Sequence, residues 1–346
     1  MKVARYYAPG DIRLEYSPEP DPGPGELKIR VRNCSICGTD VSISRFGHHR
    51  IAPPRVLGHE VAGEVCEVGA GVAGWNAGDR VQVVPVIPCG TCRACHNGWL
   101  NVCPGRRTIS YDYDGGFSRY MIVPAQALTV GGVNRIPDQL SFEEASMAEP
   151  LATVINGQEL VRVGAGDDVA VIGAGPIACL HVRLARARGA GRVLMVNRGA
   201  ARLAMAAGLV EPDAAICADR VDVVQAVRDL TDGRGPDVVV VAAPAGSAHE
   251  QAIAMAAQRG RISLFGSLPP RDSRITCDSN AVHWGELTIA GASGSSPAQN
   301  AAALALIASG QVPVRDLITH KLPLDQVLEA IETAARGEAM KVTIEP

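Results

Sequence analysis

The stretch that decides the fold of this chain reads Asp168-Val169-Ala170-Val171-Ile172-Gly173-Ala174-Gly175-Pro176-Ile177-Ala178. Its first half is an apolar run without alternation, which is typical of a parallel strand covered on both faces. A glycine-rich turn follows at once and opens a helix that we expect to end near Arg188. Gly173 permits the tight turn, Gly175 lets the backbone approach a pyrophosphate, and Ala178 is small enough for the helix to pack on the strand. This context predicts a dinucleotide-binding unit, against the alternative of an ordinary strand–helix turn.

Cofactor choice depends on the residues around that turn and at the end of the next predicted strand. Pro176 and Ile177 open the helix whose N-terminus would meet the phosphates, so both belong to the predicted cofactor-binding set. NAD enzymes normally end the second strand with Asp or Glu, which bonds the ribose 2′-hydroxyl. Here that residue is the neutral Asn197, and Arg198 and Arg202 follow where both can reach a 2′-phosphate. We therefore expect a preference for NADP, unless Asn197 bonds the hydroxyl of NAD and the arginines are solvated.

The surrounding sequence contains regions with different patterns of predicted secondary structure. Residues 1–149 contain short valine-rich strands bounded by Gly, Asp and Pro, and they predict a β-rich domain. Residues 150–295 alternate predicted strands and helices, which indicates an α/β unit with a doubly wound parallel sheet of the Rossmann type. The predicted strands of this unit after the first are 191–197, 214–217, 237–242, 261–265 and 287–290. Residues 296–346 add two predicted helices and a final strand.

A second decisive stretch, about 88–104, carries four thiols within a short loop. They are Cys89, Cys92, Cys95 and Cys103. This spacing lets one loop surround a single ion tetrahedrally, so it predicts a structural zinc site. Buried free thiols and two disulfides are the alternatives, and the enzyme-like length and the absence of a signal-length apolar run argue against disulfides. A nucleic-acid-binding zinc module also uses four cysteines, so the loop alone does not give function.

Composition narrows the possible functions. The chain has 346 residues, of which 47% are hydrophobic and 20% charged, as in an ordinary globular protein of about two domains. Its net charge of -3 gives no electrostatic reason to expect nucleic acid or an acidic membrane as a partner. No apolar run reaches the length of a membrane span, and we expect a cytoplasmic protein. The remaining scattered cysteines are expected to be small buried residues; they are Cys34, Cys66, Cys179, Cys217 and Cys277.

Cys37 and His59 suggest a second, reactive metal site in the first domain. A thiolate and an imidazole are good zinc ligands, although each taken alone is more often structural. At this point the chain resembles the zinc-dependent medium-chain alcohol dehydrogenases, nearest their sorbitol (polyol) dehydrogenase branch. The resemblance rests on five segments, Cys37–Asp40, Gly58–Glu60, Cys89–Cys103, Glu149–Ala152 and Gly173–Ala178.

The resemblance implies a GroES-like catalytic domain, to which residues 296–346 return, and a catalytic zinc in addition to the structural one. It implies that Cys37 and His59 are ligands of the catalytic zinc and that Glu149 is the third. Glu60 matches the carboxylate behind the metal that can transiently replace a ligand or water.

Other roles follow from the same resemblance. Thr39 matches the hydroxyl that takes the substrate proton, and Asp40 matches the partner that orients the zinc-bound histidine. Lys341 matches a basic residue that reaches back to the cofactor pyrophosphate. Some alcohol dehydrogenases carry a relay histidine three residues after the hydroxyl, where this chain has Ser42.

Two segments bear on the substrate. Tyr111–Asp114 lies where the resembling enzymes build the substrate-pocket wall, and its hydroxyls and carboxylates suit a hydroxyl-rich or amino-bearing substrate; a polar surface loop is the alternative. Sorbitol dehydrogenases place an Arg-Tyr pair where this chain has Gly294-Ser295. Losing two large side chains predicts a wider pocket and a bulkier ring substrate than free sorbitol.

The leading prediction is a zinc-dependent enzyme that moves a hydride between NAD(P) and a secondary alcohol of a polyol, sugar or cyclitol. One alternative is a zinc-independent quinone or enone reductase of the same superfamily, which usually lacks the Cys37/His59 pair and the four-cysteine loop. The other is a non-catalytic dinucleotide-sensing protein. By analogy with the family, we expect a homodimer or homotetramer with a small-molecule substrate.

Overall fold

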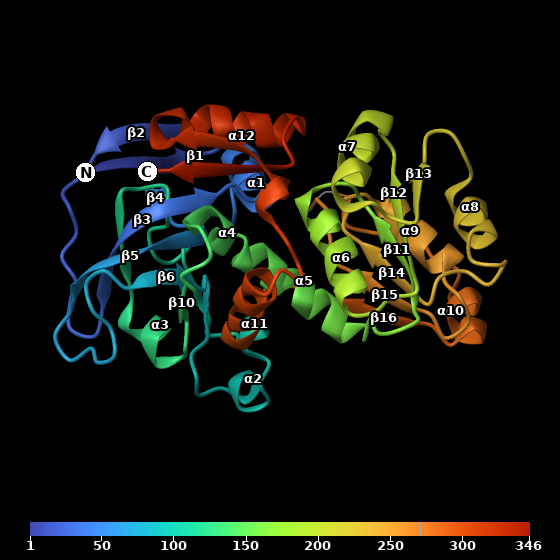
Figure 1. Cartoon of the computed structure of the whole chain (residues 1–346), viewed down its shortest axis with the longest axis horizontal. Helices are drawn as coiled ribbons and strands as arrows, with labels where there is room; N and C mark the ends of the chain where they lie inside the picture. The colour runs from blue at the N-terminus through green and yellow to red at the C-terminus, as the bar shows by residue number, and fades with distance from the viewer. Residues whose placement is uncertain (270–271) are drawn as a thin grey trace. The chain divides into compact units, whose positions relative to one another are not determined.

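A computed structural model of the chain describes residues 1–269 and 272–346 (Figure 1). These residues form two compact units. The first comprises Met1–Ala152 and Gly294–Pro346, and the second comprises Thr153–Ser293. The chain passes from the first unit to the second within one helix, α5 (Ala148–Leu160).

The first unit is built on antiparallel strands. One sheet has the order β2-β1-β4, a larger one has the order β10-β6-β5-β3-β18-β17 with β9 also paired to β3, and β7 pairs with β8. Only β17 and β18 pair in parallel in this unit, among the residues that the structure describes. The strands are β1 (Lys2–Ala8), β2 (Asp11–Tyr16), β3 (Leu27–Ser35), β4 (Arg55–Val56), β5 (Glu60–Val68), β6 (Arg80–Val83), β7 (Val86–Ile87), β8 (Arg107–Thr108), β9 (Tyr120–Val123), β10 (Val133–Arg135), β17 (Ile318–Pro323) and β18 (Lys341–Glu345).

Short helices cover and connect these strands. They are α1 (Gly38–Phe46), α2 (Arg93–His96), α3 (Ala125–Thr129), α4 (Phe142–Ser146), α11 (Pro297–Ala308) and α12 (Val327–Arg336), with single turns at Leu100–Val102, Arg315–Leu317 and Leu324–Gln326. Apolar residues of β3, β5 and α12 pack into one core, which includes Leu27, Val61 and Ile331. Thus the final segment, residues 294–346, completes the core of the first unit.

The second unit confirms the predicted doubly wound parallel sheet. Its order is β13-β12-β11-β14-β15-β16, and every pair in it is parallel. The strands are β11 (Asp168–Ile172), β12 (Arg192–Asn197), β13 (Ala214–Cys217), β14 (Val238–Val241), β15 (Arg261–Leu264) and β16 (Thr288–Gly291). Every residue of β11 and β14 is buried, as expected for strands with helices on both faces.

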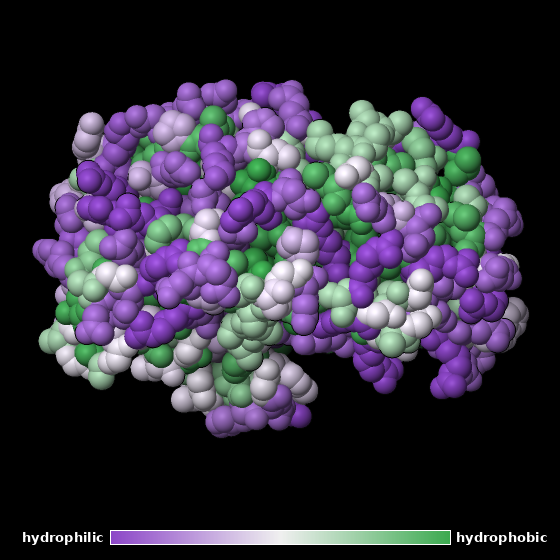
Figure 2. Space-filling model, viewed as in Figure 1, coloured by the Kyte–Doolittle hydropathy of each residue, from purple (hydrophilic) through white to green (hydrophobic). Residues whose placement is uncertain are grey.

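Helices alternate with these strands: α6 (Pro176–Ala187), α7 (Ala200–Val210), α8 (Val223–Asp229), α9 (Gly246–Met255) and α10 (Ser279–Gly285). The last of them, α10, is a short helix capped by Asp278, whose side chain accepts from the Asn280 backbone N–H. No helix of the described ranges is both long and apolar enough to cross a membrane. The face drawn in Figure 2 mixes hydrophilic and hydrophobic residues.

The expectation for the scattered cysteines was only partly right. Cys34 and Cys179 are buried, Cys66 and Cys217 are half-buried, and Cys277 is exposed. Cys217 lies on the edge strand β13 and Cys277 lies in the loop before α10, where the fold leaves a side chain open in a way that single-residue hydrophobicity does not reveal.

Candidate active site

Cys37 lies where the central strand of the larger sheet gives way to a helix. Strand β3 ends at Ser35, and Cys37 is the residue that precedes α1. The carboxylate of Asp40, in the first turn of that helix, accepts the Cys37 backbone N–H at 2.9 Å. This bond satisfies one of the free donors at the helix start and fixes the backbone that carries the thiol.

Neighbouring strands bring two further charged groups to the same edge. In the sheet order β5-β3-β18, Glu60 pairs with Ser35, and Thr343 pairs with Ser35 from the other side. Glu60 begins β5 and Lys341 begins β18. The Lys341 ammonium lies 2.5 Å from a carboxylate oxygen of Glu60, and both side chains are at most 3% exposed.

Cys37, His59 and Glu60 form a group suited to a metal ion, which we call the mixed-ligand group. One ligand atom from each residue lies within 4.8 Å of the other two. Asp40 Oδ1 is 3.7 Å from His59 Nδ1, which is too long for a direct hydrogen bond, so the orienting role of Asp40 stays a prediction. A thiolate, an imidazole and a carboxylate make a donor set that suits zinc. The residues present therefore fit the catalytic zinc that the sequence predicted.

Glu149, the expected third ligand, lies near this group but not in it. It sits in the first turn of α5 and is 6% exposed. Burial raises its pKa to about 7, with His59 acting against the rise and the charge of Glu60 adding to it. The carboxylate that groups with Cys37 and His59 is Glu60, and the role of Glu149 as the third ligand stays a prediction.

Lys341 has a different immediate partner from the one that the resemblance implied. Burial acts to lower its pKa, but the charges of Glu60 and Cys37 outweigh burial and raise the pKa above its ordinary value. The lysine is thus a buried cation beside the mixed-ligand group. The reason is the position of β18 next to β3, which turns the first residue of β18 towards Glu60.

The predicted proton-accepting hydroxyl and the relay position both lie on α1. Thr39 is half-buried and directly precedes Asp40, whereas Ser42 is exposed. An exposed hydroxyl at the relay position is open to solvent. The role of the Thr39 hydroxyl stays a prediction.

The two carboxylates of the segment Tyr111–Asp114 have partners within the first unit. The side chain of Asp112 accepts the Thr108 backbone N–H at 2.8 Å and pairs with Arg50. The Asp114 side chain accepts the Val56 backbone N–H at 3.0 Å. These carboxylates stabilise the loop, and the expectation that they face a substrate stays a prediction.

Tyr111 has different surroundings. Its ring centroid lies 4.7 Å from that of His48, which in turn stacks on His49 at 4.6 Å. Burial raises the pKa of the Tyr111 hydroxyl, and the hydroxyl is close enough to His59 and Cys37 for their charges to act on it. The tyrosine therefore belongs to the surroundings of the mixed-ligand group.

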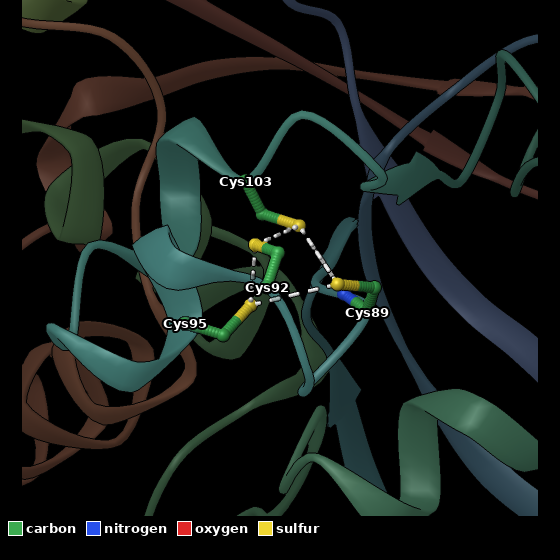
Figure 3. A group of neighbouring side chains, drawn as sticks. All are labelled: Cys89, Cys92, Cys95 and Cys103. Atoms are coloured by element: carbon green, nitrogen blue, oxygen red, sulfur yellow. Dashed lines mark hydrogen bonds between the residues drawn. The ribbon is translucent and has the colours of Figure 1, made fainter.

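The four thiols of the 88–104 loop, which we call the tetrathiolate lobe, converge as predicted (Figure 3). The sulfur–sulfur distances shown are 3.5 Å for Cys89–Cys103, 3.6 Å for Cys92–Cys95 and Cys92–Cys103, and 3.9 Å for Cys89–Cys95. A tetrahedron with zinc–sulfur bonds of about 2.3 Å has edges of roughly 3.8 Å. The geometry fits zinc, and the thiols form no disulfide.

The glycine turn of the second unit has the geometry that the sequence predicted. Gly173 adopts a φ of 132°, and its missing side chain leaves its Cα free to approach the backbone after β14, where a Cβ would lie 3.3 Å from the Ala242 carbonyl carbon. Gly175 precedes α6, and Pro176 is the first residue of that helix. The start of α6 thus presents free N–H groups beside the turn, as an anion-binding helix end does.

The three residues expected to select the cofactor, Asn197, Arg198 and Arg202, differ in their contacts and in their exposure. The Asn197 side-chain amide donates to the Gly199 carbonyl at 3.1 Å, which orders the turn after β12. Arg202 donates its Nε–H to the Ala174 carbonyl at 3.0 Å, so it rests on the glycine turn itself. Arg198 is exposed. Of the two arginines, Arg198 is the more open to a 2′-phosphate.

Sequence reasoning missed two features of the site. The first is the ion pair between Lys341 and Glu60, which arises from strand order and has no local signature. The second is His48, which meets Tyr111 only after the chain has folded. A histidine one residue beyond a glycine has no spacing that indicates a site.

Comparison with known protein families identifies the class. Residues 23–134 match the alcohol dehydrogenase GroES-like domain, and residues 176–309 match the zinc-binding dehydrogenase family. The chain therefore belongs to the zinc-dependent medium-chain alcohol dehydrogenases, and it is an NAD(P)-dependent alcohol or polyol dehydrogenase of that family.

Individual relatives cover nearly the whole chain. The L-threonine 3-dehydrogenase of Pyrococcus horikoshii is 37% identical over 331 residues, covering 93% of this chain and 92% of the relative. The sorbitol dehydrogenase of Halalkalibacterium halodurans is 31% identical, covering 99% and 98%. A solved zinc-binding dehydrogenase from Sinorhizobium meliloti, bound to NADP, is 31% identical, with a TM-score of 0.92 and coverage of 100% and 99%. The predicted family and fold are confirmed.

Proposed function

We propose that this enzyme oxidises a secondary alcohol of a polyol, sugar or cyclitol, or reduces the corresponding ketone, with NAD(P) as partner. The observation that carries the proposal is the mixed-ligand group with the buried Lys341 beside it. A purely structural metal site would not need a buried cation next to its carboxylate. The domains proposed for this chemistry are 1–149 with 296–346 for the substrate and 150–295 for the cofactor.

Each residue of the site has its own role in the proposed reaction. When bound, zinc supplies Lewis acidity towards the alcohol oxygen, and the dinucleotide supplies the hydride acceptor. Cys37, His59 and Glu60 hold the metal, and Asp40 keeps the imidazole of His59 oriented. Thr39 takes the hydroxyl proton of the substrate.

Two buried groups tune this site. Lys341 balances the negative charge of Glu60, which lowers the cost of keeping a carboxylate in a dry environment. Glu149 remains the alternative third ligand, because it lies within electrostatic reach of His59 and Glu60.

A substrate screen with metal analysis tests the function. Polyols, sugars, cyclitols and aminocyclitols are offered with NAD and with NADP, and absorbance of the reduced nicotinamide is followed. L-Threonine belongs in the screen as a second candidate, since a relative that is 37% identical is an L-threonine 3-dehydrogenase. Two zinc ions per chain and turnover of a secondary alcohol would support the proposal. A metal-free protein active on quinones or enones would instead favour the reductase alternative, and cofactor binding without turnover would favour a sensor.

The residues at positions 294 and 295 bear on the size of the substrate. Gly294 and Ser295 replace the two large side chains of sorbitol dehydrogenases, and Ser295 is fully buried with its hydroxyl accepting from Asn300. We therefore propose a ring substrate in preference to free sorbitol. High activity on sorbitol, with none on cyclic or glycosidic alcohols, would refute this part.

We also propose a cytoplasmic homodimer or homotetramer, which sedimentation of the purified protein tests.

We further propose that NADP is preferred and that Arg198 carries the preference. A charge-assisted hydrogen bond to the 2′-phosphate contributes roughly 1.5–3 kcal/mol, which corresponds to about ten- to a hundredfold in affinity. Arg198→Ala should lower kcat/KM for NADP by about that factor and leave NAD nearly unchanged. Arg220→Ala is the matched control, because Arg220 is an exposed arginine of the same unit beyond β13. A wild-type preference for NAD that Arg198→Ala does not alter would contradict the assignment.

A further inference from the structure

Cys217 is a half-buried thiol of the second unit that the proposed chemistry does not use. It is the last residue of β13, the edge strand that pairs in parallel with β12 (Figure 1). In the register of that pair, Cys217 lies opposite Asn197, the last residue of β12. The thiol therefore lies beside the turn that follows β12, at the carboxyl edge of the sheet.

The turn after β12 is the place where NADP and NAD would be distinguished. In doubly wound sheets, a residue after the second strand bonds the adenosine ribose of NAD, and an arginine nearby accommodates the 2′-phosphate of NADP. In the proposed function that arginine is Arg198, which is exposed. An exposed arginine has many accessible rotamers, so the direction in which its backbone points the side chain decides where the charge can reach.

The backbone on both sides of Arg198 is held by hydrogen bonds from the segment that contains Cys217. The Ala218 backbone N–H donates to the Asn197 carbonyl at 2.9 Å, and the Cys217 thiol donates to the Arg198 carbonyl at 3.0 Å. These two carbonyls belong to the peptide planes that precede and follow the Arg198 Cα. Because each plane is rigid, holding both planes fixes φ and ψ at Arg198, and with them the direction of its Cα–Cβ bond.

The next carbonyl of the turn is held as well. The Asn197 side-chain amide donates to the Gly199 carbonyl at 3.1 Å, so three successive carbonyls of the turn accept hydrogen bonds. A carbonyl oxygen carries partial negative charge and would repel a phosphate, whereas the Arg198 carbonyl is directed towards β13 by its bond to Cys217. The thiol thus keeps one unfavourable dipole away from the place where the phosphate would bind.

We propose that Cys217 is a positioning residue for cofactor selection, because its thiol holds the Arg198 carbonyl and so directs the Arg198 side chain towards the 2′-phosphate of NADP. The inference rests on the proposed preference for NADP through Arg198. It assigns the thiol no contact with the cofactor and no redox chemistry. Its effect should therefore appear in the ratio of the affinities for NADPH and NADH, and only while Arg198 is present.

Titration calorimetry of the zinc-loaded, full-length enzyme with NADPH and with NADH measures that ratio. Cys217→Val removes the donor and places a small residue of high strand propensity on β13. We expect the preference for NADPH to fall by about three- to fivefold, a modest loss because a thiol is a weak donor. Cys217→Ala also lacks the donor and gives the same test if the valine variant does not fold. Cys217→Ser keeps a donor and should stay within about 1.5-fold of the wild-type ratio.

A double-mutant cycle with Arg198→Ala shows whether the thiol acts through the arginine. In the Arg198→Ala background the guanidinium is absent, so Cys217→Val should change the ratio no further. Cys277→Val changes an exposed cysteine of the same unit and is the matched control, with the wild-type ratio as its expected result.

Three outcomes would overturn the proposal. An unchanged ratio in Cys217→Val would show that the thiol does not position Arg198, and an equal fall in Cys217→Ser would exclude the hydrogen bond as the cause. An undiminished effect of Cys217→Val in the Arg198→Ala background would show that the cysteine acts by another route. A ratio that Arg198→Ala leaves at the wild-type value would instead refute the proposed role of Arg198 itself.

Discussion

The tetrathiolate lobe and the mixed-ligand group both offer metal-binding side chains, but the lobe takes them from one loop and the mixed-ligand group takes them from separate elements. The lobe takes all four sulfurs from residues 89–103, so one loop can close around an ion with little help from the rest of the chain. The mixed-ligand group takes its donors from the start of α1 and from the residues at and just before the start of β5. It therefore exists only when the large sheet is assembled.

The two groups also differ in the charged residues that surround them. The lobe is only partly buried apart from Cys103, whose burial raises its pKa to about 12. The backbone N–H of Thr91 and other donors lower the pKa of Cys89 to about 6. The charged residues at and around the mixed-ligand group are buried, with Asp40, Glu60, Glu149 and Lys341 all at most 6% exposed, while Cys37 itself is half-buried. A closed set of thiolates holds a metal for stability, whereas a mixed set inside a charged, dry environment leaves the metal chemically useful.

Removing the thiolate of the mixed-ligand group should have the largest effect. We expect Cys37→Ser to lower kcat by more than about a thousandfold, because loss of the metal removes several kcal/mol of charge stabilisation. Thermal stability should change little, and zinc content should fall from two ions per chain to one. Cys277→Ser, at an exposed cysteine, is the control. Loss of both metals in Cys37→Ser would contradict the separation of the two groups.

The corresponding change in the lobe should give the reverse pattern. Cys95→Ser should lower the Tm by about 10 °C, because a structural zinc contributes folding free energy directly. Soluble protein that remains should keep its other zinc and a substantial part of its turnover. Differential scanning calorimetry and metal analysis measure both quantities. A variant with normal Tm but no activity would show that the lobe belongs to the reactive site.

The lobe and the glycine turn could be predicted from sequence because their information is local. Few local structures are compatible with four cysteines within one loop, or with a strand followed by Gly173 and Gly175. The doubly wound, parallel character of the second sheet also follows from alternating strands and helices. Such features depend on neighbours in the chain, which the sequence displays directly.

The mixed-ligand group could be predicted only through family resemblance, and incompletely. The positions of Cys37, Glu60 and Glu149 in the sequence do not indicate which of the two buried carboxylates lies nearer to the thiolate. The pairing of Lys341 with Glu60 depends on β18 lying beside β3, more than two hundred residues away in sequence. Long-range strand order has no local signature, so these contacts required the structure.

That ion pair gives the third and smallest expected effect. Lys341→Met leaves the Glu60 carboxylate buried without its cation, and breaking a buried pair in this way costs about 3 kcal/mol. The loss should be seen in metal-free protein by urea unfolding. It should be smaller in zinc-loaded protein, where the metal supplies positive charge to the same carboxylate. Lys321→Met is the matched control, since Lys321 pairs with Glu143 at 2.6 Å but is 52% exposed. A surface pair of that kind contributes at most about 1 kcal/mol.

A double-mutant cycle isolates the pair from other effects of the lysine. In Glu60→Gln/Lys341→Met both charges are gone, so the double variant should be more stable than Lys341→Met alone. The coupling then measures how strongly the lysine and the carboxylate depend on one another. Strict additivity of the two single changes would mean that the ion pair does not stabilise the enclosed site. In that case Lys341 would be retained for another reason, and contact with the cofactor pyrophosphate, as the family resemblance implies, would become the leading explanation.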